Sequence, residues 1–159
     1  MLRPLAAALL LLVTPAAAQQ TSTFGGLQAD TKAPVEVSAD ALSVNQADGS
    51  ATFTGNVVIG QGEMRLSAGE VKVVYARGGQ SRIDSLSATG GVTLVSGPDA
   101  AEAEAATYDV EAGQITLTGD VVLTRGQNVL VGERMVVDLG AGTAAVEGRV
   151  RSVFQPGGE

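Results

Sequence analysis

Two residue types that carry much of enzyme chemistry, histidine and cysteine, are missing from this chain. The acidic residues are the first candidates left for a chemical site. The sequence contains no histidine and no cysteine, which excludes His-based triads, thiol nucleophiles and the commonest zinc ligands. Its acids cluster most densely at Asp99, Glu102 and Glu104, and closely spaced carboxylates can bind calcium. No EF-hand loop or Gly-Gly-x-Gly-x-Asp repeat accompanies them. A solvated loop and strand face is therefore the better interpretation of this cluster.

Glycines and carboxylates suggest two further kinds of site. The chain contains Thr-Gly-x-Val strings that could cradle phosphate, but no helix start follows them, and such cradles depend on a helix N-terminus. Positions without a side chain, where strands bend or cross closely, explain these glycines better. Spacing does not exclude a carboxylate pair for glycoside hydrolysis, yet only two tyrosines and no tryptophan could line a sugar cleft. The sequence therefore predicts no enzyme, no metal site and no cofactor.

The Thr-Gly-x-Val strings belong to an internal repeat. They occur at Thr54–Val57, Thr89–Val92 and Thr118–Val121, and more weakly at Glu147–Val150. The second glycine follows the first by 35 residues (90 − 55), and the next two follow by 29 each (119 − 90 and 148 − 119). An acid precedes each string, at Asp40, Glu70, Glu104 and Glu133. Such self-similarity predicts one supersecondary unit stacked several times.

The elements that form this unit are strands. Apolar or small residues alternate with polar ones through Phe53–Ile59 and Ile115–Leu123, and Gly-containing turn signals separate such runs. The only helix-tolerant stretch, Asp99–Ala106, falls where the repeat needs a strand, so we expect a strand there. A change of apolar parity around Gly69-Glu70 predicts a β-bulge at that pair. The fold class is all-β, with about eight or nine long antiparallel strands.

The first residues are typical of an export signal. Arg3 precedes the apolar run Leu5–Val13, and Ala16–Ala18 fits an A-x-A cleavage site. The apolar run is far shorter than the roughly 20 residues of a spanning helix, although an uncleaved anchor is the alternative. We expect a cleaved signal peptide over 1–18, a flexible leader over 19–33, one domain over 34–156 and a tail over 157–159.

The charge of the mature chain limits its partners. The full chain has 10 basic and 17 acidic residues, and loss of Arg3 leaves 9 against 17, a net charge of −8. Nucleic acid and anionic membrane surfaces are poor partners for such a protein. With no cysteine, an exported domain must be stabilised by its sheet and packing alone.

The candidate binding residues are apolar side chains that the alternation assigns to the inward faces of the strands. They are Phe53, Val57, Ile59, Leu66, Val71, Val73, Val92, Leu94, Leu117, Val121, Leu123, Val131 and Val137. An ordinary β-sandwich closes such a face into a packed core. The other interpretation is two sheet faces held apart as a groove that admits acyl chains. Composition does not choose between them.

The segment Ala51–Gly62, with its Phe-Thr-Gly-Asn-Val core, resembles the signature of the LptA/OstA-like family of lipopolysaccharide-transport proteins. The lead-in Pro34–Asp40 and the later Ile115–Val121 and Gly132–Val137 are similar too, so the likeness runs from about Pro34 to Pro156. It implies an open, V-shaped β-jellyroll of stacked antiparallel strands. It also implies a periplasmic bridge that carries lipopolysaccharide from the inner to the outer membrane, with lipid A acyl chains in the groove.

The resemblance further implies partners at both ends of the stack. These are a similar jellyroll in the inner-membrane transport complex, the N-terminal domain of the outer-membrane translocon, and further copies in a head-to-tail homo-oligomer. We expect the joining edges to contain Val35, Val37, Val146, Val150 and Phe154. Two alternatives are a related OstA-like domain with another role in the same pathway, and a structural β-solenoid scaffold with a closed core.

Overall fold

A computed structural model describes residues 30–78 and 82–156, and every regular element in these ranges is a β-strand. The strands are β1 (Glu36–Ser38), β2 (Ala41–Asn45), β3 (Ser50–Gln61), β4 (Met64–Tyr75), β5 (Ile83–Thr89), β6 (Val92–Ser96), β7 (Asp99–Ala103), β8 (Ala105–Asp109), β9 (Gln114–Arg125), β10 (Asn128–Asp138), β11 (Thr143–Glu147) and β12 (Arg151–Val153). Within the described ranges no helix has the length and apolar character to cross a membrane. The expected cleavage site, most of the expected leader and the tail lie outside these ranges.

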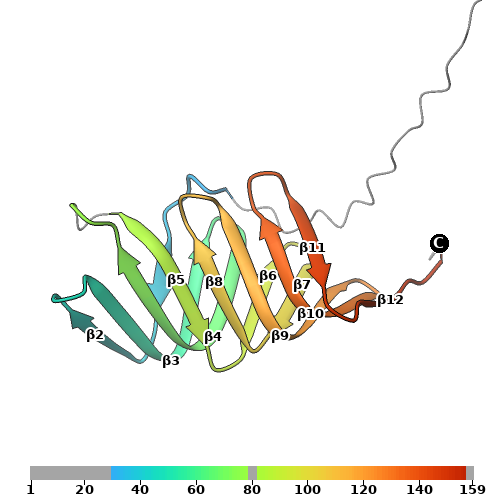
Figure 1. The fold of residues 1–159 in the computed structure, drawn as a ribbon, viewed down its shortest axis with the longest axis horizontal. Coiled ribbons are helices and arrows are strands. Elements are labelled where there is room, and N and C mark those ends of the chain that lie inside the picture. Colours follow the sequence, from blue (N-terminus) through green and yellow to red (C-terminus); the bar gives the residue numbers. More distant parts are fainter. Residues whose placement is uncertain (1–29, 79–81, 157–159) are drawn as a thin grey trace, which may run out of the picture.

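The strands pair antiparallel and are stacked along one direction, from β2 at one end to β11 and β12 at the other (Figure 1). The long strands β3, β4, β9 and β10 each pair with three other strands, and the two halves of each long strand belong to different walls. The first wall consists of β2, the first half of β3, the second half of β4, β5, β8, the first half of β9, the second half of β10, and β11. The second wall consists of β1, the other halves of the same long strands, β6, β7 and β12. The result is the expected all-β jellyroll.

The two walls meet along a line that we call the spine, and the Thr-Gly-x-Val strings form it. In β3, Gly55 (φ 80°) and Asn56 (φ 46°) together face only Gly69 of β4. In β9, Gly119 and Asp120 likewise interrupt the register with β10. These are β-bulges, which bend a strand. The bulge predicted at Gly69-Glu70 was placed on the wrong strand, because the extra residue belongs to the facing string.

In three of the four repeat units, the backbone amide of the acid donates to the carbonyl of the repeat glycine. The Asp40 amide donates to the Gly55 carbonyl over 2.9 Å, and the Asn56 side-chain amide donates to the Asp40 carboxylate over 2.8 Å. The Glu104 amide donates to the Gly119 carbonyl over 3.0 Å. These contacts explain why the acid and the glycine recur together in the sequence.

The strand count differs from the sequence-based expectation. Twelve strands occur in the described residues instead of about eight or nine, because positive-φ pairs such as Gly90-Gly91 and Gly148-Arg149 end one strand and begin another. The expectation of a strand over Asp99–Ala106 is confirmed by β7 and β8. Two alanines of this stretch, Ala101 and Ala106, are buried. Such small side chains pack in the interior of a sheet as well as they pack in a helix.

Candidate functional site

The candidate site is the apolar interior between the two walls. Eleven of the thirteen predicted residues are buried, with exposures of 0–4%: Val57, Ile59, Leu66, Val71, Val73, Val92, Leu94, Leu117, Val121, Leu123 and Val137. Phe53 is half-buried and packs against the same cluster. The cluster contains residues of both walls and extends from β3 to β10. The walls therefore pack on each other, and the interior is filled by its own side chains in this structure.

Val131 was assigned to the inward face, and this assignment was wrong. Val131 is 36% exposed, and Leu130 is the neighbour that packs against the interior. The inward positions of β10 are Leu130 before the spine and Met135 after it, so the parity changes across Gly132-Glu133. The sequence shows no such change at this point, because the bulge that causes it lies on β9.

Several interior residues were missed in the sequence-based list of candidates. Leu86 of β5, Ile115 of β9 and Met135 of β10 are 0–2% exposed, and Met64 at the start of β4 is 1% exposed. The alternation of Leu86 and Ala88 with Ser85 and Ser87 was the available signal for β5. Adding these residues makes the apolar interior continuous along the sheet.

The prediction that the acid cluster forms a solvated face is wrong for Asp99. Asp99 is 2% exposed, and its carboxylate lies 3.3 Å from the guanidinium of Arg125. Glu102 is exposed, and Glu104 caps the spine. Within the described residues no three metal-binding side chains come together. Asp99 thus joins β7 to β9 at the end of the ladder between these two strands.

One polar pair lies buried in the apolar interior and connects the two walls. The Tyr108 hydroxyl of the first wall donates to the side-chain oxygen of Gln61 in the second wall over 2.8 Å. Their exposures are 4% and 2%. Burial raises the pKa of Tyr108, and the hydrogen bond to Gln61 offsets part of that rise. Sequence reasoning missed this pair, since Gln61 stands in a Gly-Gln-Gly string that resembles a turn.

The interior opens at the N-terminal end of the stack. A cavity of about 270 Å³ lies there, between β2, the start of β3 and Tyr75. Leu42 and Val44 line it and are 56% and 62% exposed. These two side chains continue the apolar interior to the surface of the molecule.

The predicted edge residues divide into two groups. Val35, Val37 and Val146 are half-buried and pack against the interior. Val150 and Phe154 are 51% and 54% exposed. The segment that contains Val146, Val150 and Phe154 is interrupted at Gly148-Arg149, so β11 borders the first wall and β12 borders the second. Leu42 and Val44 were not among the predicted edge residues.

These features define a class of protein: an antiparallel β-jellyroll with an apolar interior between two walls and a sheet edge at each end. The family model described as "LptA/(LptD N-terminal domain) LPS transport protein" matches residues 36–143. The chain belongs to this family of transport proteins and is LptA/OstA-like.

The chain is also similar to two individual proteins. An uncharacterised protein of Rhizobium meliloti (strain 1021) is 34% identical over 114 residues, which cover 67% of this chain and 61% of the relative. The match thus spans about three fifths of that relative's length. The crystal structure of LptH from Pseudomonas aeruginosa has a TM-score of 0.70 at 20% identity, covering 80% of this chain and 99% of LptH. LptH is described as the LptA-homologous periplasmic component of the lipopolysaccharide transport device. At this identity the likeness shows the shared fold.

Proposed function

We propose that the chain is a periplasmic, non-enzymatic bridge component that carries lipopolysaccharide from the inner to the outer membrane. The observation that carries this proposal is the apolar interior, which extends from the N-terminal cavity to β10 within a fold of the transport family. Burial of one methylene is worth roughly 0.8 kcal/mol, so a chain of roughly a dozen carbons gains on the order of 10 kcal/mol by leaving water. A path made of Val, Ile and Leu supplies this gain without directional bonds that would hold the cargo in one place.

Acyl chains can enter this interior only if the walls separate, because the interior side chains already fill it. The walls share a covalent connection along the spine, where β3, β4, β9 and β10 pass from one wall to the other. Rotation about the spine would open the interior while keeping each ladder paired. The acidic outer surface would leave the phosphorylated sugars outside.

The packed interior also favours a second candidate, a structural scaffold with a closed core. A photo-crosslinker separates the two functions. At Leu117, which is 0% exposed, it should capture lipopolysaccharide in cells. At the neighbouring exposed Thr118 it should capture little, since alternate residues of a strand face opposite sides. Circular dichroism would confirm that both variants fold. Equal capture at the two positions, or none at Leu117, would contradict the lipid path.

Export is a separate part of the proposal. LptH, which shares this fold, is described as a periplasmic component, and Ala16–Ala18 fits a cleavage site. We expect the mature chain to begin at Gln19, and the intact mass of protein purified from periplasm measures this directly. Retention of Met1 would argue against a soluble bridge.

The same fold supports partners at both ends. We propose that the N-terminal edge, with β1 and β2, and the C-terminal edge, with β11 and β12, join similar jellyrolls by strand addition. The partners would be the inner-membrane component, the N-terminal domain of the outer-membrane translocon, and other copies of this chain. Because the two edges differ, the joint is heterologous and produces a head-to-tail chain instead of a closed dimer.

A further inference from the structure

A short turn before β1 crosses the opening between the two walls. This turn, Asp30–Ala33, is called the N-terminal strap. A Cβ atom built on Gly62, in the β3–β4 turn of the second wall, would lie 3.6 Å from the Asp30 Cβ atom. A Cβ atom built on Gly113, in the β8–β9 turn of the first wall, would lie 3.7 Å from the Thr31 side chain. The strap therefore reaches the rims of both walls. In Figure 1 it is the blue segment at the upper edge.

The strap is fastened to the buried polar pair. The Gln61 side-chain amide donates to the carbonyls of Thr31 over 3.3 Å and Ala33 over 3.0 Å, while its oxygen accepts from Tyr108. Gln61 thus binds the strap, the second wall and the first wall at one point. The sequence predicted a flexible leader as far as residue 33, but these last four residues are held against the domain.

Other observations indicate that the strap can leave as a unit. Its own turn is closed by local bonds, from the Lys32 amide to the Asp30 carboxylate over 3.0 Å and from the Ala33 amide to the Asp30 carbonyl over 2.9 Å. Asp30, Thr31 and Lys32 are exposed, so release uncovers little apolar surface. Water can replace the Gln61 amide at the two strap carbonyls.

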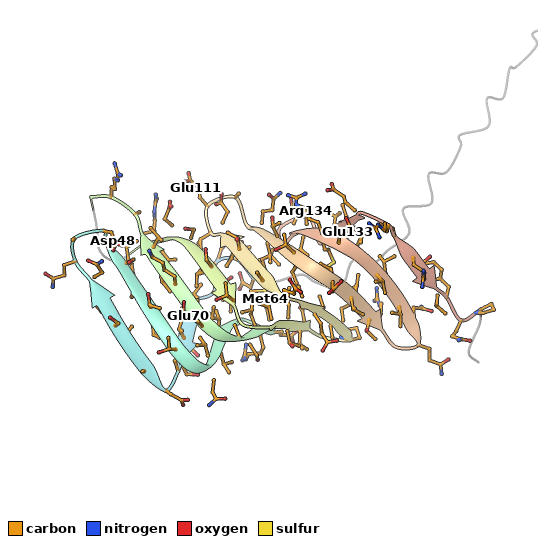
Figure 2. All side chains as sticks on the ribbon, turned by 60° about the horizontal axis from the view of Figure 1, so that its bottom comes forward. Asp48, Met64, Glu70, Glu111, Glu133 and Arg134 are labelled. Atoms are coloured by element: carbon orange, nitrogen blue, oxygen red, sulfur yellow. The ribbon has the colours of Figure 1, made fainter. Side chains whose placement is uncertain are left out.

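We propose that the N-terminal strap is a gate over the lipid path, closed by Gln61 and opened when acyl chains separate the walls. This inference rests on the proposed function. Figure 2 shows Asp48 and Glu111, from two turns of the first wall, along one edge of the molecule, and the strap reaches this rim at the β8–β9 turn that contains Glu111. Entry of a chain at this point requires the walls to part, which the Tyr108–Gln61 bond and the strap both oppose.

Limited proteolysis with trypsin tests the closed state without any lipid. Trypsin cleaves after lysine, and Lys32 lies in the strap, so the cleavage rate there reports how firmly the strap is held. Methionine has nearly the length of glutamine but donates no hydrogen bond, so Gln61→Met should release the strap while filling its space. We expect cleavage after Lys32 to become at least tenfold faster, relative to cleavage after Arg149, whose side chain is 92% exposed. The control Gln114→Met changes an exposed glutamine on β9 and should leave the ratio unchanged. An unchanged ratio in Gln61→Met would overturn the fastening by Gln61.

A designed disulfide tests the gate itself. The chain has no cysteine, and the distance of 3.6 Å between the Asp30 Cβ and a Cβ built on Gly62 suits a disulfide. In the double variant Asp30→Cys/Gly62→Cys, oxidation should slow the loading of fluorescent lipopolysaccharide at least tenfold, and reduction of the same sample should restore it. Equal loading rates in the oxidised and reduced states would overturn the gate alone. Failure of the wild-type protein to bind lipopolysaccharide would overturn the proposed function, and the gate with it.

Discussion

Replacement of Gly119 by alanine is expected to destabilise the fold by about 2–5 kcal/mol. Gly119 has φ 82°, a region that costs a residue with a Cβ atom about 1–2 kcal/mol. The added Cβ atom would also lie 2.5 Å from a carboxylate oxygen of Glu104 and 2.8 Å from its Cβ atom. Overpacking of this kind costs typically about 1–3 kcal/mol more. Urea unfolding followed by circular dichroism measures the sum.

Gly126→Ala is the matched control for this effect. Gly126 also has a positive φ, of 58°, but nothing lies within 4 Å of a Cβ atom built there. Its replacement should cost only the backbone contribution, about 1–2 kcal/mol. In the Gly119→Ala background, Glu104→Ala should recover part of the loss by removing the close carboxylate. Equal destabilisation at Gly119 and Gly126 would show that packing at the spine has no energetic role.

The repeat predicted much of the fold, but the path of each strand through the spine depends on its neighbour. Period-two alternation identifies the long strands β3 and β9 from the sequence alone. Whether Gly55-Asn56 or Gly69-Glu70 holds the extra residue depends on which carbonyls the facing strand offers, and no local pattern encodes this. The same dependence explains why Val131 lies on the outer face, although the sequence of its own strand gives no sign of a change in parity.

The sequence predicted which residues lie in the interior better than it predicted whether the two walls pack on each other. Most of the aliphatic candidates are buried, because inward parity follows from the alternation. Composition left open whether the two apolar faces pack or stay apart, and the family resemblance favoured an open groove, but the structure shows the faces packed on each other. Contact of these residues with lipid stays a prediction. Gln61 could not be found by pattern, because its partners Thr31 and Tyr108 are far from it in the sequence.

The second large effect that we expect is on self-association of the protein. The structure indicates other residues for the joint between protomers than the sequence did. At the N-terminal end, Leu42 and Val44 extend the apolar interior to the surface and line the cavity there. At the other end, Val153 and Phe154 are 52% and 54% exposed. A protomer added to either edge would cover apolar side chains worth roughly 1.5–3 kcal/mol each when fully buried. The earlier candidates Val35, Val37 and Val146 already contribute to the interior of their own domain.

A lysine in place of an apolar side chain that the joint covers would have to lose its water, and this opposes association. We expect the head variant Leu42→Lys/Val44→Lys and the tail variant Val153→Lys/Phe154→Lys each to weaken self-association at least 100-fold, which corresponds to about 2.8 kcal/mol. Each variant should still fold, because the replaced side chains are at least half exposed. Light scattering across a concentration series measures the association, and Ser43→Lys, on the opposite face of β2, is the control.

Mixing the two variants distinguishes a head-to-tail joint from any symmetric one. The head variant keeps an intact C-terminal edge and the tail variant keeps an intact N-terminal edge. An equimolar mixture should therefore form one-to-one dimers that cannot grow, because only one intact joint remains for each pair. In a symmetric dimer, one edge would meet its own copy, so the variant that keeps this edge intact would still pair before any mixing. Variants that still associate like the wild type would place the joint outside both edges, whereas dimers that form only on mixing require the heterologous joint that a bridge of repeated protomers needs.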